Sequence, residues 1–112
     1  MRVIARRTLI EFTESLRGSK DSKAVKAALD SWFHEADAAT WSTPADVKNS
    51  YGNASIVGDD RVVFNIKGNG YRLVVAIDYG RHIVFIKWLG THQQYDEIDA
   101  KTVKYGDKAD QK

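Results

Sequence analysis

The sequence predicts an α+β fold, with N-terminal helices packed on one face of a small, mainly antiparallel β-sheet. Two observations predict this class. Apolar residues recur at helical spacing in the first half of the chain, and three runs rich in β-branched and aromatic residues follow in the second half. At 112 residues and 43% hydrophobic content, the chain has enough apolar material for one core.

The chain is expected to begin with a short edge strand at Val3 and Ile4. Thr8 and Glu11 have the spacing of a capping box, so they predict the start of a first helix, and Gly18 predicts its end.

A second helix is predicted from Ser22 to Ala39, because apolar residues recur there at steps of three and four. These residues are Val25, Ala28, Leu29, Trp32, Phe33 and Ala36. The apolar stripe is expected to cover the apolar face of the sheet. Thr43 before Pro44 then predicts a short helix that reaches Ser50.

Three strands are predicted at residues 62–67, 71–78 and 82–89, after a short run at residues 55–57. Asn69-Gly70 and Tyr79-Gly80 are the expected two-residue turns between them. With these turns, Arg72 lies opposite Lys67 on one neighbouring strand and opposite Lys87 on the other.

The period of two along each strand then separates two faces of the sheet. One is apolar and is expected to be buried; it consists of Phe64, Ile66, Leu73, Val75, Ile77, Val84, Ile86 and Trp88. The opposite face carries the cation row Lys67, Arg72 and Lys87, followed by a row of Asn65, Val74 and Phe85.

Three cations side by side destabilise a sheet, so the row favours an anion-binding site. The alternative is that these cations are solvated residues that guard the sheet against aggregation. Residues 61–90 carry five cations against one acid, whereas the whole chain has a net charge of only +2. This local charge favours a polyanionic partner such as nucleic acid.

Several classes of site are excluded or disfavoured. The chain has no cysteine, so it has neither a disulfide framework nor a thiolate metal site. No long apolar run predicts a signal or a membrane span, and a cytoplasmic location is expected. His34-Glu35 lacks a second histidine four residues later, and no dinucleotide or Walker sequence is present, so neither a metal nor a cofactor is predicted.

The segment from Thr91 to Asp96 carries the groups that RNA cleavage without a metal requires. His92 can transfer protons near neutral pH, and Tyr95 can stack on a base or assist. Arg72 offers a forked set of donors for phosphate, to which Lys67 adds positive charge. The alternative is a capped loop beneath which His92 and Tyr95 are half-buried.

The run FNIKGN-YRL followed by GTH--YD, at residues 64–73 and 90–96, resembles the HigB toxin family within the RelE-like group. The likeness extends upstream through residues 45–48 and 54–55. It implies a RelE-like fold over residues 1–100. The polar tail at 101–112 lies outside the recognisable pattern and is expected to be flexible. The likeness also implies a toxin of a type II toxin-antitoxin system that cleaves mRNA, commonly on the ribosome.

The resemblance further implies a hetero-oligomer with a HigA-like helix-turn-helix antitoxin. The predicted catalytic residues are Arg72, His92, Tyr95 and Lys67, and the predicted RNA-binding residues are Lys87, Asn69, Asn65, Phe85 and Thr91. Two other functions remain open. One is a RelE-fold poison of a protein such as gyrase, and the other is a non-catalytic module that binds RNA or the ribosome.

Overall fold

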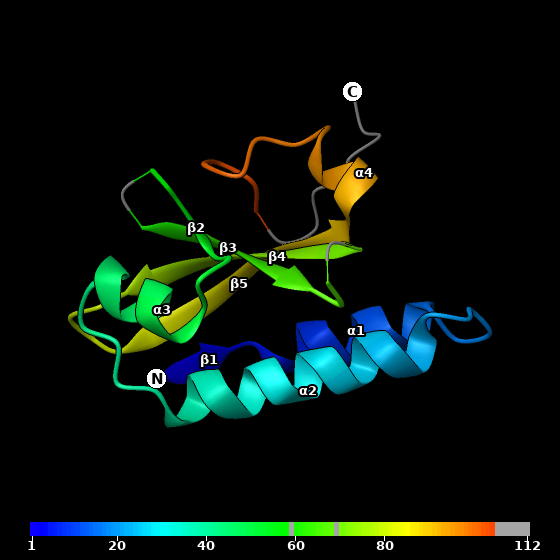
Figure 1. Cartoon of the computed structure of the whole chain (residues 1–112), viewed down its shortest axis with the longest axis horizontal. Helices are drawn as coiled ribbons and strands as arrows, with labels where there is room; N and C mark the ends of the chain where they lie inside the picture. The colour runs from blue at the N-terminus through cyan, green and yellow to red at the C-terminus, as the bar shows by residue number, and fades with distance from the viewer. Residues whose placement is uncertain (59, 69, 105–112) are drawn as a thin grey trace.

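A five-stranded sheet forms the centre of the molecule, with N-terminal helices on one face and the C-terminal segment on the other (Figure 1). The computed structural model describes residues 1–58, 60–68 and 70–104. Its elements are β1 (Arg2–Ile4), α1 (Arg6–Ser15), α2 (Ser22–Ala38), α3 (Pro44–Ser50), β2 (Ser55–Val57), β3 (Arg61–Ile66), β4 (Tyr71–Asp78), β5 (Ile83–Thr91) and α4 (His92–Tyr95). The predicted α+β class is confirmed.

The strand order is β1-β5-β4-β3-β2. Strand β1 lies at one edge and pairs in parallel with β5, which confirms the predicted edge strand. The remaining pairs are antiparallel. All three of these pairs join successive strands through short loops, as expected for a meander.

The helices agree with the sequence except at the start of α1. Helix α2 begins at Ser22 and α3 begins at Pro44, both as predicted. The expected capping box of Thr8 and Glu11 is wrong. Helix α1 begins two residues earlier, at Arg6, and the Thr8 N–H donates to the carbonyl oxygen of Ala5 at 3.0 Å. Arginine is a good helix former, so residues 6 and 7 extend the helix beyond the cap signal.

The register of β3 and β4 differs from the prediction by two residues. Ile66 pairs with Tyr71, so the connection is a loop over residues 67–70 instead of a two-residue turn. Lys67 begins this loop in the left-handed region at φ 53°, and its carbonyl oxygen accepts from the Gly70 N–H at 3.1 Å. Because two is an even number, every β3 side chain keeps its predicted face, but Arg72 lies opposite Asn65 and not opposite Lys67.

Strand β5 contains a bulge that the sequence did not indicate. Val75 pairs with Ile86, whereas Val74 pairs with Trp88, so Lys87 is an extra residue on β5. One extra residue reverses the faces beyond it. The prediction that Trp88 shares the apolar face of Ile86 is therefore wrong.

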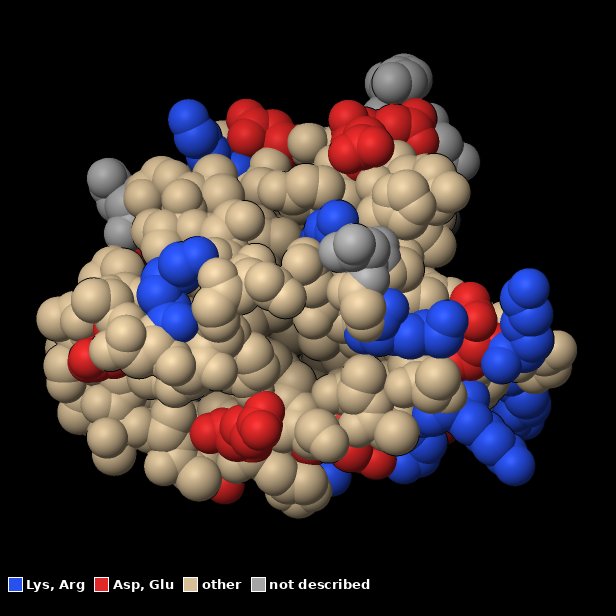
Figure 2. Space-filling model, in the orientation of Figure 1, with Lys and Arg blue, Asp and Glu red and all other residues tan. Residues whose placement is uncertain are grey.

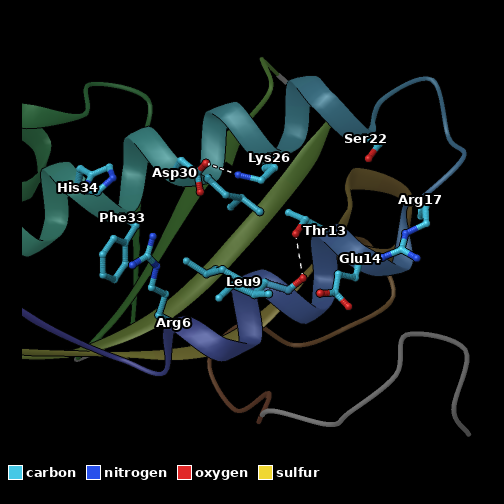
Figure 3. Close-up of a pocket in the computed structure, with 12 residues that line it drawn as sticks. Arg6, Leu9, Thr13, Glu14, Arg17, Ser22, Lys26, Asp30, Phe33 and His34 are labelled. Atoms are coloured by element: carbon cyan, nitrogen blue, oxygen red, sulfur yellow. Dashed lines mark hydrogen bonds and ion pairs between the residues drawn. The ribbon is translucent and has the colours of Figure 1, made fainter.

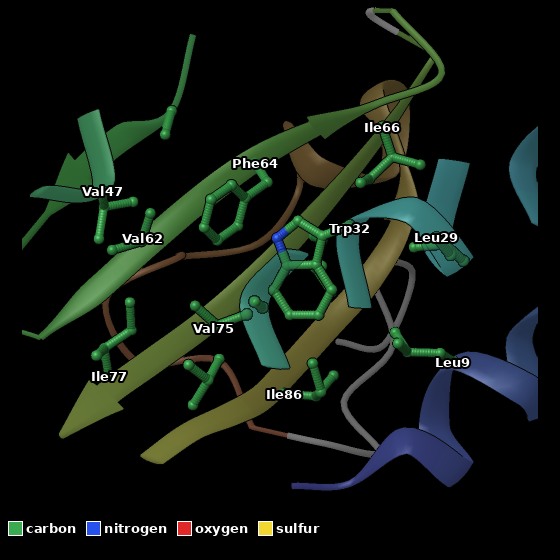
Figure 4. Close-up of a cluster of buried hydrophobic side chains, with 14 of the residues drawn as sticks. Leu9, Leu29, Trp32, Val47, Val62, Phe64, Ile66, Val75, Ile77 and Ile86 are labelled. Carbon is green, nitrogen blue, oxygen red and sulfur yellow. The ribbon is translucent and has the colours of Figure 1, made fainter. Parts of the chain in front are cut away.

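The main core lies between α2 and the sheet (Figure 4). Trp32 is 2% exposed and meets the Phe64 ring edge to face, with 5.4 Å between the ring centroids. Leu29 is also buried, and Phe33 is partly buried beside the same cluster. These contacts confirm that the apolar stripe of α2 covers the apolar face of the sheet.

A second, smaller cluster occupies the opposite face of the sheet. It consists of Val63, Val74, Trp88, Ala100 and Val103, with Val57, Tyr95 and Ile98 packed against it. The Arg61 guanidinium is buried there, and its Nη1 donates to the carbonyl oxygens of Ala100 at 3.0 Å and Val103 at 2.8 Å. Packed structure thus continues past residue 100 to Val103; residues 105–112 of the expected tail lie outside the described residues.

Candidate functional site

Arg72 lies on the face of the sheet opposite α2, where it was predicted to lie. Its cross-strand neighbours are Asn65 on β3 and Gly90 on β5. The guanidinium carbon is 5.9 Å from the centroid of the Tyr95 ring, and Nη1 donates to the Tyr71 carbonyl oxygen at 3.3 Å. The guanidinium is therefore bonded to the backbone of β4 and lies at the outer range of a cation–π contact with Tyr95.

A capping box places Tyr95 beside Arg72. The Thr91 hydroxyl accepts from the Gln94 N–H at 3.1 Å, and the Gln94 side-chain oxygen accepts from the Thr91 N–H at 2.9 Å. Helix α4 therefore begins directly after β5 and turns back over the sheet (Figure 1). The Tyr95 ring also lies 6.3 Å from that of Trp88, centroid to centroid.

Gly90 provides the space for this arrangement. A Cβ at this position would lie 2.5 Å from Cη2 of Trp88 and 2.7 Å from the side-chain oxygen of Gln94. The first distance is too short for any carbon contact. A side chain at residue 90 would therefore displace the Trp88 ring, the capping box, or both.

His92 is exposed and is the first residue of α4. Its backbone N–H donates to the carbonyl oxygen of Gly70 at 3.1 Å, which ties α4 to the loop between β3 and β4. The structure therefore gathers Arg72, His92 and Tyr95 at one end of the sheet, although His92 is distant from Arg72 in sequence.

Lys67 is not part of a cation row. It extends toward the start of α2, and its Nζ lies 3.1 Å from an oxygen of the Asp21 carboxylate. The other carboxylate oxygen accepts from the Tyr71 hydroxyl at 3.2 Å. The hydrogen bond from Lys67 lowers the pKa of Asp21, and burial raises the pKa of Tyr71, as does its bond to Asp21.

Lys87 and Phe85 lie farther along β5. Lys87 occupies the bulge, three positions from the residue that pairs with Arg72, and its Nζ is 5.6 Å from the centroid of the Phe85 ring. The predicted row of Lys67, Arg72 and Lys87 is therefore wrong, because the longer β3–β4 loop displaces Lys67. The expected Tyr79-Gly80 turn is also wrong: Asp78 pairs with Ile83, and this shift of two residues together with the bulge displaces Lys87 by three positions. Asn69 lies outside the described residues.

Asp21 was missed by the sequence reasoning. It is far from Lys67 and Tyr71 in the chain, and an aspartate just before a helix is the ordinary signal for an N-cap. Only the packing of α2 on the sheet brings it to the loop between β3 and β4.

Charged side chains are unevenly distributed over the surface (Figure 2). Acidic side chains gather over α4 and the turn that follows it, where Asp96, Glu97 and Asp99 are exposed. Lys and Arg gather where α1 is joined to α2; the exposed cations of this stretch are Arg17, Lys20, Lys23 and Lys26. The charge distribution therefore favours the approach of a polyanion to Arg72 from the side of the β3–β4 loop over approach from the side of α4.

A cavity of about 450 Å³ lies between α1 and α2, away from Arg72 (Figure 3). The Arg6 guanidinium covers the Phe33 ring there, at 4.4 Å from its centroid, and Lys26 pairs with Asp30 at 2.7 Å. His34 lines the same cavity and is exposed. No predicted catalytic residue lines this cavity.

Within the described residues, no group of three His, Asp or Glu side chains could hold a metal ion. Nor does any helix in that part of the chain have the length and apolar character needed to cross a bilayer.

Comparison with protein families identifies a matching family model. The model of the HigB toxin family, described as the RelE-like toxic component of a toxin-antitoxin system, matches residues 25–98. This range contains α2 from Val25 onward and the whole meander, with Arg72, His92 and Tyr95, and it begins after Asp21. Comparison with the curated proteins gives no match.

Proposed function

We propose that this chain, which belongs to the HigB family of RelE-like toxins of toxin-antitoxin systems, is an endoribonuclease that cleaves messenger RNA on the ribosome. One observation carries the proposal: the Arg72 guanidinium lies 5.9 Å from the centroid of the Tyr95 ring, at the end of the sheet where His92 is exposed. Phosphate binding, base stacking and proton transfer are thereby available within one small surface.

The proposed reaction is attack by a 2′-hydroxyl on the neighbouring phosphate. The hydroxyl loses its proton, its oxygen bonds to phosphorus, and the bond from phosphorus to the 5′-oxygen breaks. The leaving 5′-oxygen takes up a proton, so the products carry a 2′,3′-cyclic phosphate and a 5′-hydroxyl. His92 takes part in the proton transfers, Arg72 stabilises the negative charge that develops on the phosphate, and Tyr95 stacks on a base.

The other predicted residues have supporting roles in this proposal. Lys67 is a catalytic residue that supplies positive charge beside the β3–β4 loop. Thr91 holds α4 through its capping bond, which determines where His92 and Tyr95 lie. The RNA contacts extend along the same face through Asn65, Phe85 and Lys87, and through Asn69 in the loop. No metal is required, since side chains supply both the charge and the proton transfer.

Substitution of Arg72 and His92 tests the catalytic assignment. Arg72→Ala should slow cleavage about 100- to 1000-fold, the loss expected when one donor to a developing anion is removed. His92→Ala should slow it about 100- to 10,000-fold, since proton transfer is lost. Single-turnover cleavage of ribosome-bound message measures both rates, with thermal unfolding recorded in parallel.

Arg81→Ala and His82→Ala are matched controls, because both residues are exposed in the loop at the opposite end of β4. They should cleave at the wild-type rate. If His92→Ala is folded and cleaves as fast as the wild type, another group moves the protons. If the wild type binds ribosomes but leaves message intact, the chain is a non-catalytic binder.

The family implies an antitoxin partner. We propose that it is a HigA-like helix-turn-helix protein that forms a hetero-oligomer with this chain. A cationic site among cellular RNA must be restrained, so co-expression of the partner should abolish growth arrest and message cleavage. Unchanged toxicity on co-expression of the helix-turn-helix protein encoded beside this chain would contradict the assignment of the partner.

A further inference from the structure

The Asp21 carboxylate binds two residues at the ends of the loop between β3 and β4: Lys67, which begins the loop, and Tyr71, the first residue of β4. One oxygen pairs with Nζ of Lys67 at 3.1 Å, and the other accepts from the Tyr71 hydroxyl at 3.2 Å. Tyr71 is only 5% exposed, and its ring meets Phe12 of α1 edge to face at 5.9 Å between centroids. The start of α2 and the first residue of β4 therefore meet at one carboxylate, and α1 packs on the same tyrosine.

The Asp21 side chain does not cap the helix that follows it. The residue precedes Ser22 as the N-cap of α2, where an aspartate side chain commonly accepts a hydrogen bond from a helix N–H, yet Asp21 makes no such bond. Its backbone carbonyl oxygen accepts from the Val25 N–H at 2.9 Å, so the helix begins normally. Both carboxylate oxygens are instead directed at the β3–β4 connection.

This connection leads directly to the proposed site. The loop begins at Lys67, which has a left-handed φ of 53°, and its last residue, Gly70, accepts the backbone N–H of His92 at 3.1 Å. Tyr71 is followed by Arg72. Asp21 thus binds Lys67, which begins the loop, and Tyr71, which directly follows it. Tyr71 lies between Gly70, the backbone partner of His92, and Arg72.

We propose that Asp21 is a positioning residue of the ribonuclease site, an inference that rests on the proposed function. Its carboxylate holds the β3–β4 loop against α2, so that the Gly70 carbonyl oxygen stays in place to accept from the His92 N–H. The same carboxylate determines the orientation of the Lys67 side chain. An ammonium group has three N–H donors, so the bond to one carboxylate oxygen leaves Lys67 donors for a phosphate. Asp21 precedes the residues that the family model matches, so the family match does not assign it this role.

The first test needs no RNA. Amide hydrogen exchange should be faster at Gly70 and His92 in Asp21→Asn than in the wild type, because the loop opens more often. Lys67→Met breaks the same ion pair from an exposed residue and should have the same effect. Asp30→Asn is the matched control, since Asp30 also lies on α2 and pairs with a lysine, Lys26, at 2.7 Å. Wild-type exchange at Gly70 and His92 in both Asp21→Asn and Lys67→Met would overturn the proposal.

The second test measures cleavage. Asp21→Asn should slow single-turnover cleavage of ribosome-bound message about 10- to 100-fold, the usual scale for residues that orient a reacting group, with ribosome binding unchanged. In a Lys67→Met background it should cause little further loss, because the two residues act through one contact. Asp30→Asn should cleave as the wild type does.

Two cleavage results would contradict this role. Equal slowing by Asp21→Asn with and without Lys67 would mean that the carboxylate does not act through its ion pair with Lys67. Faster cleavage by Asp21→Asn would mean that it restrains Lys67 instead of positioning it. Failure of the proposed function is distinguishable, since the wild type would then not cleave message, while the exchange measurement would still decide whether Asp21 holds the loop.

Discussion

Gly90 determines how closely the aromatic and polar groups around Arg72 can approach one another. It pairs with Arg72 across β4 and β5. The Trp88 ring and the Gln94 side chain lie so close to it that no room is left for a Cβ. The absence of a side chain allows Trp88 to pack beneath Tyr95 while Gln94 closes the capping box. One glycine therefore supports both the second cluster and the start of α4.

Gly90→Ala should lower the free energy of unfolding by about 1 to 3 kcal/mol, since the added methyl overpacks a filled site. It should also slow message cleavage, because displacement of α4 moves His92 and Tyr95. Gly52→Ala is the matched control, because a Cβ there has no heavy atom within 4 Å. Urea unfolding and single-turnover cleavage measure the two effects. Wild-type stability in Gly90→Ala would show that Trp88 and Gln94 move aside at no cost.

Among the elements, α2 has the largest part in holding the N-terminal layer to the sheet. Its buried residues are Val25, Leu29, Trp32 and Ala36, all on one stripe. The Trp32 ring contacts Phe64 on β3, whereas its Nε1 has no hydrogen-bond partner among the described residues. Trp32 therefore stabilises the fold by packing, and the burial of its unpaired N–H reduces that stabilisation.

Trp32→Ala should lower the free energy of unfolding by roughly 3 to 5 kcal/mol, as expected for loss of a buried tryptophan. Trp32→Phe should cost much less, since it keeps most of the ring and removes the unpaired donor. Urea unfolding with both variants separates packing from polarity. An equal loss in the two variants would show that Nε1 has a partner, such as a buried water, that stabilises the fold.

At the scale of the whole molecule, both faces of the sheet are covered. Helices α1 and α2 cover one face, and the segment that ends near Val103 covers part of the other. Arg61 holds this segment through the carbonyl oxygens of Ala100 and Val103. The segment consequently covers Val63, Val74 and Trp88, whereas Arg72 and Phe85 stay partly exposed on the second face.

Val103→Asp should lower the free energy of unfolding by more than about 2 kcal/mol, because a carboxylate would lose its hydration among Val63, Val74 and Trp88, while Nη1 of Arg61 already donates to the carbonyl oxygens of Ala100 and Val103. Thr102→Asp is the control, since it adds the same single negative charge to the segment but at an exposed position. Thermal and urea unfolding measure the difference. Equal stabilities would indicate that the segment leaves the sheet at little cost.

The sequence by itself determined the fold class, the extent of α2 and α3, and the face of Arg72. The reason is that each depends on local signals: helical spacing of apolar residues, a Thr-Pro start, and the period of two along a strand. Even the wrong loop between β3 and β4 left Arg72 on the correct face, because the pairing error was two residues and not one. The start of α1 was misjudged because a cap signal is weak where arginines precede it.

Only the tertiary structure decided which cations lie together. A bulge at Lys87 and a four-residue loop at Lys67 depend on the pairing of whole strands, and no local signal for either is present in the sequence. The bulge also moved Trp88 to the second face, where the C-terminal segment packs on it. Asp21 reached Lys67 only because α2 docks on the sheet, and a contact between residues so far apart in the chain follows from packing and not from sequence spacing.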